Sequence, residues 1–287
     1  MPAIVAEFGR NCAGLSGLHA GLPVAISEGE GAVVPVKNVR EGWVRTRFAG
    51  FPGFQMRVTC YEQPVTFEHL HVWMDPVNRP GPEAMAVDEW LLDHVRLPVL
   101  RIYGWLGDWG SLGYFGSLGD ATASFPGVSW VRRWTGGGTV DHRADWTYTV
   151  VAPAGEPLAD MRGDGSYRMI HAVLAAALTE EGITARLSSG DEETGASMCF
   201  ENPVNHDLVG ADGRKLAGAG QRRSRHGLLH QGSVAAFCDL ETSRLRGTRL
   251  ASGLAKHWKF KDFSPQEDRI AEMVAARYAG SQWTNRR

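Results

Sequence analysis

Three consecutive glycines in a basic, β-rich stretch constrain the fold more than any other segment of this chain. Residues 130–134 and 146–152 are rich in β-branched and aromatic residues, which predicts a strand on each side of the glycines. Glycine lacks a Cβ atom, so a turn made of it can adopt positive φ and bring backbone amides close to a ligand. We therefore predict a strand–turn–strand corner at a ligand site, with a purely structural turn as the alternative. The segment contains Arg132, Arg133, Gly136, Gly137, Gly138, Thr139, Val140 and His142.

The basic residues of this corner suit an anion, because a guanidinium can bind a carboxylate or phosphate oxygen pair in a bidentate manner. The corner is not a P-loop, since no Gly-Lys-Ser/Thr follows it and a strand, not a helix, comes next.

A second glycine-rich segment, residues 213–223, carries Lys215 and Gly218, and is followed by His230 and Gly232. An ammonium group there would neutralise an oxyanion or an α-phosphate, or lower the pKa of a neighbouring thiol. The alternative is an exposed lysine. His142 and His230 are candidate proton carriers or hydrogen-bond donors, although a histidine taken alone is more often structural. Together the two segments predict a pocket for an activated acyl group or an acyl-nucleotide.

Cys199 lies between the two segments and decides which chemistry is expected. A cysteine beside methionine and phenylalanine is usually a small buried hydrophobe. As a nucleophile it would have to be a thiolate, which a nearby cation such as Lys215 favours. Cys238 follows an apolar run and is predicted to be a core residue.

Composition limits the other possibilities. The chain has 287 residues, 43% of them hydrophobic, so it can bury a large core in one or two domains. A net charge of −2 gives no global electrostatic case for binding nucleic acid or an anionic membrane. No apolar run approaches the length of a membrane span, and four scattered cysteines argue against structural zinc or a disulfide framework. We expect no bound metal and a reducing, cytoplasmic location.

The chain is predicted to have two parts. Residues 1–66 are glycine-rich without a helical period, and are interpreted as an unassigned N-terminal extension, disordered or caused by a misassigned start, with Met56 as the alternative start. Residues 67–287 are interpreted as the catalytic domain. Within them we predict helices over 82–95 and 166–181, the latter capped by Ser166 and followed by Gly182.

The remaining patterns complete the predicted fold. Strands are expected over 99–105 and, as two or three glycine-joined strands, within 207–237. A last helix is predicted to open with a capping box at 264–267 and to end before Gly280. Helices and strands interleave without strict βαβ repetition, which favours an α+β fold with a mixed sheet and flanking helices on one side.

These motifs resemble the biotin/lipoate protein ligase superfamily, which includes lipoate–protein ligases and octanoyltransferases. The resemblance covers about residues 67–287. Within the superfamily, the chain looks most similar to cysteine-dependent octanoyltransferases of Gram-positive type. It rests on the helix at 85–92, the strand at 100–105, the Arg-Arg-Trp-Thr-Gly-Gly-Gly corner, the run Cys199-Phe200 with Pro203, Asp207-Leu208, Gly213-Arg214-Lys215 and Gln221, and the end of the chain at 278–283.

The resemblance implies a lipoate/biotin ligase-like domain in which Cys199 is the nucleophile and Lys215 its activator. It implies transfer of an octanoyl or lipoyl group from an acyl carrier protein to a lysine of a lipoyl domain or a glycine-cleavage H-type protein, with no tightly bound cofactor. The alternative is an ATP-dependent ligase that uses ATP and Mg to form lipoyl-AMP, with Cys199 incidental. A third interpretation, nucleic-acid binding through residues 222–225, is disfavoured by the near-zero net charge.

Overall fold

The computed structural model describes residues 66–190 and 203–286, together with the backbone of four strands between residues 3 and 61. The chain forms two compact units, Met1–Val65 and Thr66–Arg287. The described strands of the first unit form a sheet in the order β2-β1-β4-β3. The assignment of residues 1–66 as an extension stays a prediction. These strands are β1 (Ala3–Ala6), β2 (Val24–Ile26), β3 (Val39–Val44) and β4 (Met56–Tyr61).

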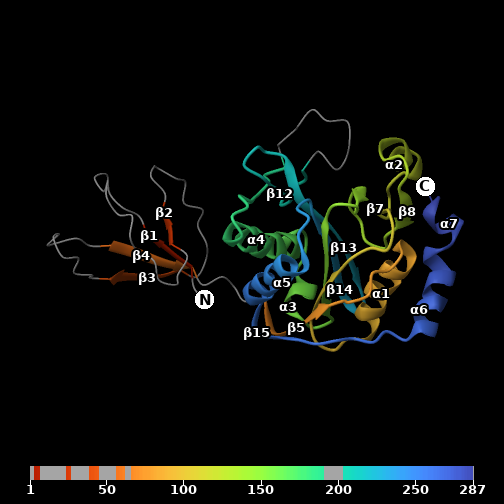
Figure 1. The fold of residues 1–287 in the computed structure, drawn as a ribbon. Helices are drawn as coiled ribbons and strands as arrows, with labels where there is room; N and C mark the ends of the chain where they lie inside the picture. Colours follow the sequence, from red (N-terminus) through yellow and green to blue (C-terminus); the bar gives the residue numbers. More distant parts are fainter. Residues whose placement is uncertain are drawn as a thin grey trace. The chain divides into compact units, whose positions relative to one another are not determined.

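The second unit is built on a mixed sheet of eight strands in the order β11-β12-β13-β14-β10-β6-β5-β15 (Figure 1). Strand β5 is parallel to both of its neighbours, and every other pair in this sheet is antiparallel. The predicted mixed sheet is thereby confirmed. Its strands are β5 (Phe67–Met74), β6 (Val99–Tyr103), β10 (Trp146–Pro153), β11 (Arg186–Leu187), β12 (Leu208–Val209), β13 (Lys215–Ser224), β14 (Gly227–Val234) and β15 (Ala255–Phe260).

Helices cover both faces of this sheet, so the expectation of helices on one side is wrong. One face carries α3 (Pro157–Asp160), α4 (Gly165–Glu180) and α5 (Leu240–Leu254). The other carries α1 (Gly81–His94), on which α6 (Glu267–Met273) and the π-helical turn Val274–Tyr278 pack (Figure 1). The reason lies in the central strands: β6, β10 and β14 are buried at every position, as strands covered on both faces must be.

The triple glycine belongs to a smaller, separate sheet, and this differs from the predicted corner. Strands β7 (Trp109–Leu112), β8 (Ser129–Arg132) and β9 (Val140–Asp141) form it in the order β8-β7-β9, and α2 (Leu118–Ser124) precedes β8. The triple glycine therefore joins the two outer strands and crosses the end of β7. It does not link a pair of neighbouring strands, as the sequence predicted. The chain enters the large sheet only afterwards, at β10.

Two predicted helix caps are also wrong, although both helices exist. Helix α4 follows Asp164, and the Ser166 hydroxyl instead donates to Gln221 and accepts from Arg223 of β13. Tertiary contacts thus override the local capping preference. Helix α6 begins at Glu267 without a side-chain cap. Gly182 does follow α4 with a φ of +87°, as predicted. Within the described residues, no helix combines the length and apolar character needed to cross a bilayer.

A buried polar network joins α1 to the sheet. Asp88 of α1 accepts from Arg101 Nη1 at 2.7 Å, and Arg101 Nη2 donates to Asp75 at 2.8 Å, all three side chains being closed off from solvent. Burial works to lower the pKa of Arg101, but the carboxylates of Asp88 and Asp75 outweigh it and raise that pKa. The second oxygen of Asp88 accepts from Tyr103, Thr149 and Gln231.

Removing this carboxylate should be costly, because it leaves a buried guanidinium partly uncompensated. We expect Asp88→Ala to lower the free energy of unfolding by about 3–5 kcal/mol in denaturant titrations. The matched control is Asp93→Ala on the same helix, whose side chain is 34% exposed and lies 4.0 Å from His226. It should change that free energy by about 0.5 kcal/mol or less. Equal losses in the two variants would contradict the role of Asp88.

Candidate active site

A cavity lies between the large sheet and the small one, on the face that carries α1. Its non-atom space amounts to about 450 Å³, a figure that includes open solvent at its mouth. The predicted residues that line it are Arg133, Gly138, Thr139, Val140, His142, Lys215, Gly218 and Gly232. Side chains that the sequence did not single out complete the wall: Met85, Tyr103, Trp105, Ser111, Thr147, Gln231 and Ser233.

The backbone of the triple glycine packs closely against glycines of two neighbouring segments. A Cβ atom at Gly113 would lie 1.8 Å from the Gly137 carbonyl oxygen, and one at Gly220 would lie 2.2 Å from that of Gly136. Gly137 also has a φ of +92°, which favours glycine. The backbone of Gly136 and Gly137 thus packs between β13 and the residue that follows β7, while Gly138 lines the cavity.

Arg133 places a buried cation at the cavity. Its Nη1 donates to the carbonyl and the hydroxyl of Ser111, at 3.1 and 2.5 Å, and its Nη2 donates to the Gly136 and Gly138 carbonyls. None of the described carboxylates pairs with it, and its Nε has no hydrogen-bond partner among the described residues. Burial lowers the pKa of Arg133 to about 10, so the guanidinium stays charged at neutral pH.

Arg132 has a different position from the one predicted. It does not line the cavity, and its guanidinium donates only to backbone carbonyls of two segments. Nη1 binds the carbonyls of residues 113, 114 and 116, whereas Nε and Nη2 bind those of 283, 284 and 286. Successive residues at a strand end face opposite ways, so one arginine reaches the cavity and the other holds the C-terminal segment, including α7 (Ser281–Thr284).

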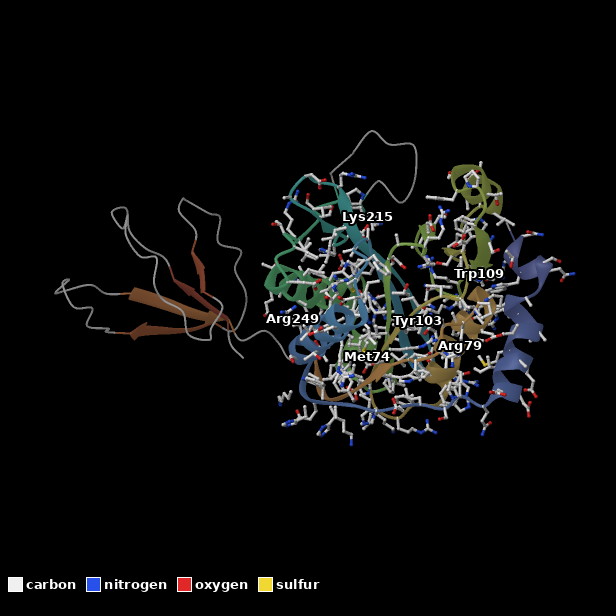
Figure 2. All side chains as sticks on the ribbon, viewed as in Figure 1. Met74, Arg79, Tyr103, Trp109, Lys215 and Arg249 are labelled. Carbon is white, nitrogen blue, oxygen red and sulfur yellow. The ribbon has the colours of Figure 1, made fainter. Side chains whose placement is uncertain are left out.

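Lys215, at the start of β13 (Figure 2), reaches the cavity by crossing over Gly218. A Cβ atom at Gly218 would lie 2.6 Å from Lys215 Cε, so a larger residue there would force the lysine side chain to shift. The ammonium lies 2.7 Å from the enclosed Asp207 carboxylate, which also accepts from the Tyr167 hydroxyl. Asp207 thus fixes the position of the Lys215 ammonium group at the wall. Cys199, the predicted nucleophile, lies outside the described residues.

The two predicted histidines lie on different faces of the sheet. His142 lines the cavity, stacked on Trp105 with ring centroids 4.1 Å apart. His230 lies on the α4 face instead, where the Tyr148 hydroxyl and the Gln221 amide bind its two nitrogens. Burial lowers the pKa of His230 well below its usual range, so it is a neutral structural residue. Gly232 reaches the cavity through its backbone.

Several residues of the site carried no signal in the sequence. Gln231 connects the glycine corner to the buried network, because it accepts from Thr135 at 2.7 Å and donates to Asp88 at 2.7 Å. Asp145 and Ser111 bind His142 from two different segments. The partners of Gln231 and of Ser111 are far apart in sequence and are brought together by strand order and register, whereas Asp145 lies only three residues from His142. Among the described residues, no cluster of three or more His, Cys, Asp or Glu side chains is placed to hold a metal ion.

The position of Arg132 gives a test of its structural role. Replacing Arg132 with Gln removes guanidinium donors that bind carbonyls of residues 113, 114, 116, 283, 284 and 286. We expect the amides of both segments to exchange with deuterium at least about tenfold faster. The control is Arg143→Gln, which removes an exposed arginine paired with Asp141. Unchanged exchange in the Arg132 variant would contradict this role.

Comparison with known proteins agrees with the resemblance seen in the sequence. The family model for the lipoyl protein ligase A/B catalytic domain matches residues 80–254. The octanoyltransferase LipM of Symbiobacterium thermophilum is 35% identical over 217 residues, 70% of this chain and 77% of that protein. The enzyme of the same name from Carboxydothermus hydrogenoformans is 32% identical over 231 residues, 74% of this chain and 86% of its own length.

Solved structures show the same fold. The bi-partite lipoate protein ligase of Thermoplasma acidophilum superposes with a TM-score of 0.59 at 16% identity, over 76% of this chain and 96% of that one. Lipoate-protein ligase A bound with ATP gives a TM-score of 0.58 at 20% identity, over 76% of this chain and 98% of that one. With the matched family model and these relatives, the chain belongs to the lipoyl protein ligase A/B catalytic domain family.

Proposed function

We propose that this protein transfers an octanoyl group from a carrier-protein thioester to a lysine ε-amine, through an acyl-thioester on Cys199. The observation that carries the proposal is its identity of 35% and 32% to proteins named octanoyltransferase, over most of their length. It is an acyltransferase of lipoate metabolism, and residues 67–287 are its catalytic domain. The donor is an acyl carrier protein, and the acceptor is a lipoyl domain or an H-type protein of glycine cleavage.

The first half of the reaction needs a thiolate. The role of Cys199 is carried over from the resemblance, and the charge of Lys215 supports it, because a nearby cation stabilises a thiolate relative to a thiol. The Asp207 carboxylate, 2.7 Å from the ammonium, fixes the position of that charge at the cavity wall. The thiolate attacks the thioester carbon, a new C–S bond forms, and the donor leaves as its own thiolate.

Attack at the thioester places negative charge on the carbonyl oxygen. Arg133 is a buried cation at the cavity without a carboxylate partner among the described residues, so it is suited to stabilise that oxyanion. The apolar groups of Met85, Tyr103 and Trp105 supply a wall for an aliphatic chain. A thioester donor already carries the required activation, so the transfer needs neither ATP nor Mg.

The covalent intermediate can be observed directly. After incubation with octanoyl carrier protein and no nucleotide, we expect intact-mass spectrometry to show one octanoyl adduct, and peptide mapping to place it on Cys199. Cys199→Ala should abolish the adduct, because no other thiolate is expected at the site. The control is Cys238→Ala, which should acylate like the wild type, since burial raises the pKa of the Cys238 thiol. An adduct absent from the wild type, with transfer appearing only on addition of ATP and lipoate, would instead establish the ligase.

Replacing Lys215 by a neutral or by a charged residue tests whether its positive charge speeds acylation. Lys215→Gln should slow formation of the acyl-enzyme about 10²-fold or more, because the thiolate and the oxyanion lose a preorganised cation. Lys215→Arg retains the charge and should be less impaired. The control is Lys259→Gln on the exposed edge strand β15, which should leave the rate unchanged. Equal acylation rates in wild type and Lys215→Gln, measured by quenched flow, would contradict the role of Lys215.

A further inference from the structure

Three side chains that the proposed first step does not use form a hydrogen-bonded chain at the same cavity. His142 Nδ1 lies 2.7 Å from Asp145 Oδ2, and His142 Nε2 lies 2.6 Å from the Ser111 hydroxyl. The side chains of His142 and Asp145 are only 4% and 5% exposed. A carboxylate, an imidazole and a hydroxyl in this order form the arrangement in which a base is oriented by an acid.

The neighbours of the chain fix the direction of its hydrogen bonds. Arg133 can only donate, so its 2.5 Å bond makes the Ser111 oxygen an acceptor and leaves the serine hydrogen for His142 Nε2. His142 then accepts at Nε2 and donates from Nδ1 to Asp145. In the neutral imidazole, this arrangement places the proton on Nδ1, where it is hydrogen-bonded to Asp145. Asp145 is in turn held by the hydroxyls of Ser233 and Thr147.

His142 is also the proton acceptor that the cavity offers. Of the described titratable residues that line it, Arg133 and Lys215 are cations, and burial raises the pKa of Tyr103 well above its usual range. Among these described lining residues, only the imidazole can take up a proton, and Asp145 would stabilise the imidazolium. Ser111 lines the cavity, and its hydroxyl is held between Arg133 and His142, which suits a proton relay.

We propose that His142 is the base of the second half-reaction, in which the acceptor lysine attacks the acyl-enzyme. The inference rests on the proposed function. The neutral amine attacks the thioester carbon, the C–N bond forms, and the C–S bond breaks with its electron pair on Cys199 sulfur. The proton lost by the amine nitrogen goes to the Ser111 hydroxyl, which passes its own proton to His142 Nε2. Asp145 is a positioning residue for the imidazole.

The two half-reactions allow a separate test of this base. The wild type and His142→Gln are first loaded from octanoyl carrier protein, and a lipoyl domain is then added to the isolated acyl-enzyme. We expect the variant to load within about threefold of the wild-type rate, and to transfer to the domain about 10²–10⁴-fold more slowly. Asp145→Asn retains the imidazole but favours the opposite tautomer, so it should also slow transfer selectively.

Small amines distinguish a base from a merely structural residue. The acyl-enzyme of each variant is mixed with a series of primary amines of decreasing pKa. The deficit of His142→Gln should shrink along the series, because a more acidic nitrogen in the intermediate loses its proton to water without a base. Asp141→Asn is the control, since Asp141 pairs with the exposed Arg143 and does not bind the imidazole.

The outcomes separate the two proposals. A wild-type protein that forms no adduct would overturn the proposed function, and this inference with it. Wild type and His142→Gln acyl-enzymes that transfer at the same rate would overturn the inference alone. The inference would also be overturned if the His142 and Asp145 variants both lost as much rate in loading as in transfer. A transfer deficit that stays constant along the amine series would overturn it too. Either result would reflect loss of structure and not loss of a base.

Discussion

The buried ion pair between Asp88 and Arg101 is the interaction on which the rest of the catalytic unit depends. The Asp88 carboxylate neutralises Arg101 between α1 and the sheet, and it accepts from three further side chains on β6, β10 and β14. One of these, Gln231, extends the network to Thr135 and hence to the glycine corner. The position of the ligand-facing loop is therefore set by the same charge pair that fixes helix α1 on the sheet.

Two adjacent arginines illustrate how the fold uses buried charge. Arg132 is satisfied by backbone carbonyls, which ties the loop after β7 to the C-terminal segment. Arg133 is bound by neutral groups alone, so its charge remains available at the cavity. Lys215 differs again, because the carboxylate of Asp207 holds it. The cavity wall thus carries two cationic side chains, one without and one with a carboxylate partner among the described residues, and such groups suit an oxyanion and a thiolate.

The sequence predicted the elements with strong local signals, and the structure confirms the helices near 82–95 and 166–181 and the two or three strands expected within 207–237. It also predicted Arg133, His142 and Lys215 as candidates, and the structure brings them to one cavity. It misplaced His230, because a residue's face depends on register, which periodicity did not fix. It gave no indication of Asp145 or Ser111. The contact of Ser111 with His142 depends on the pairing of β7 with β9, whereas Asp145 reaches the imidazole from three residues along the chain. The predicted helix cap at Ser166 is wrong, because the hydrogen bonds of its hydroxyl with β13 outweigh the local preference of serine for a cap position.

The most direct test of the account is a crystal structure of the protein trapped after loading with octanoyl carrier protein. The account predicts continuous density from the Cys199 sulfur into the cavity. The acyl carbonyl oxygen should lie within hydrogen-bonding distance of Arg133 or Lys215, and the aliphatic chain beside Met85 and Trp105. An acyl group bound outside this cavity, or density for the acyl chain without a bond to Cys199, would contradict it.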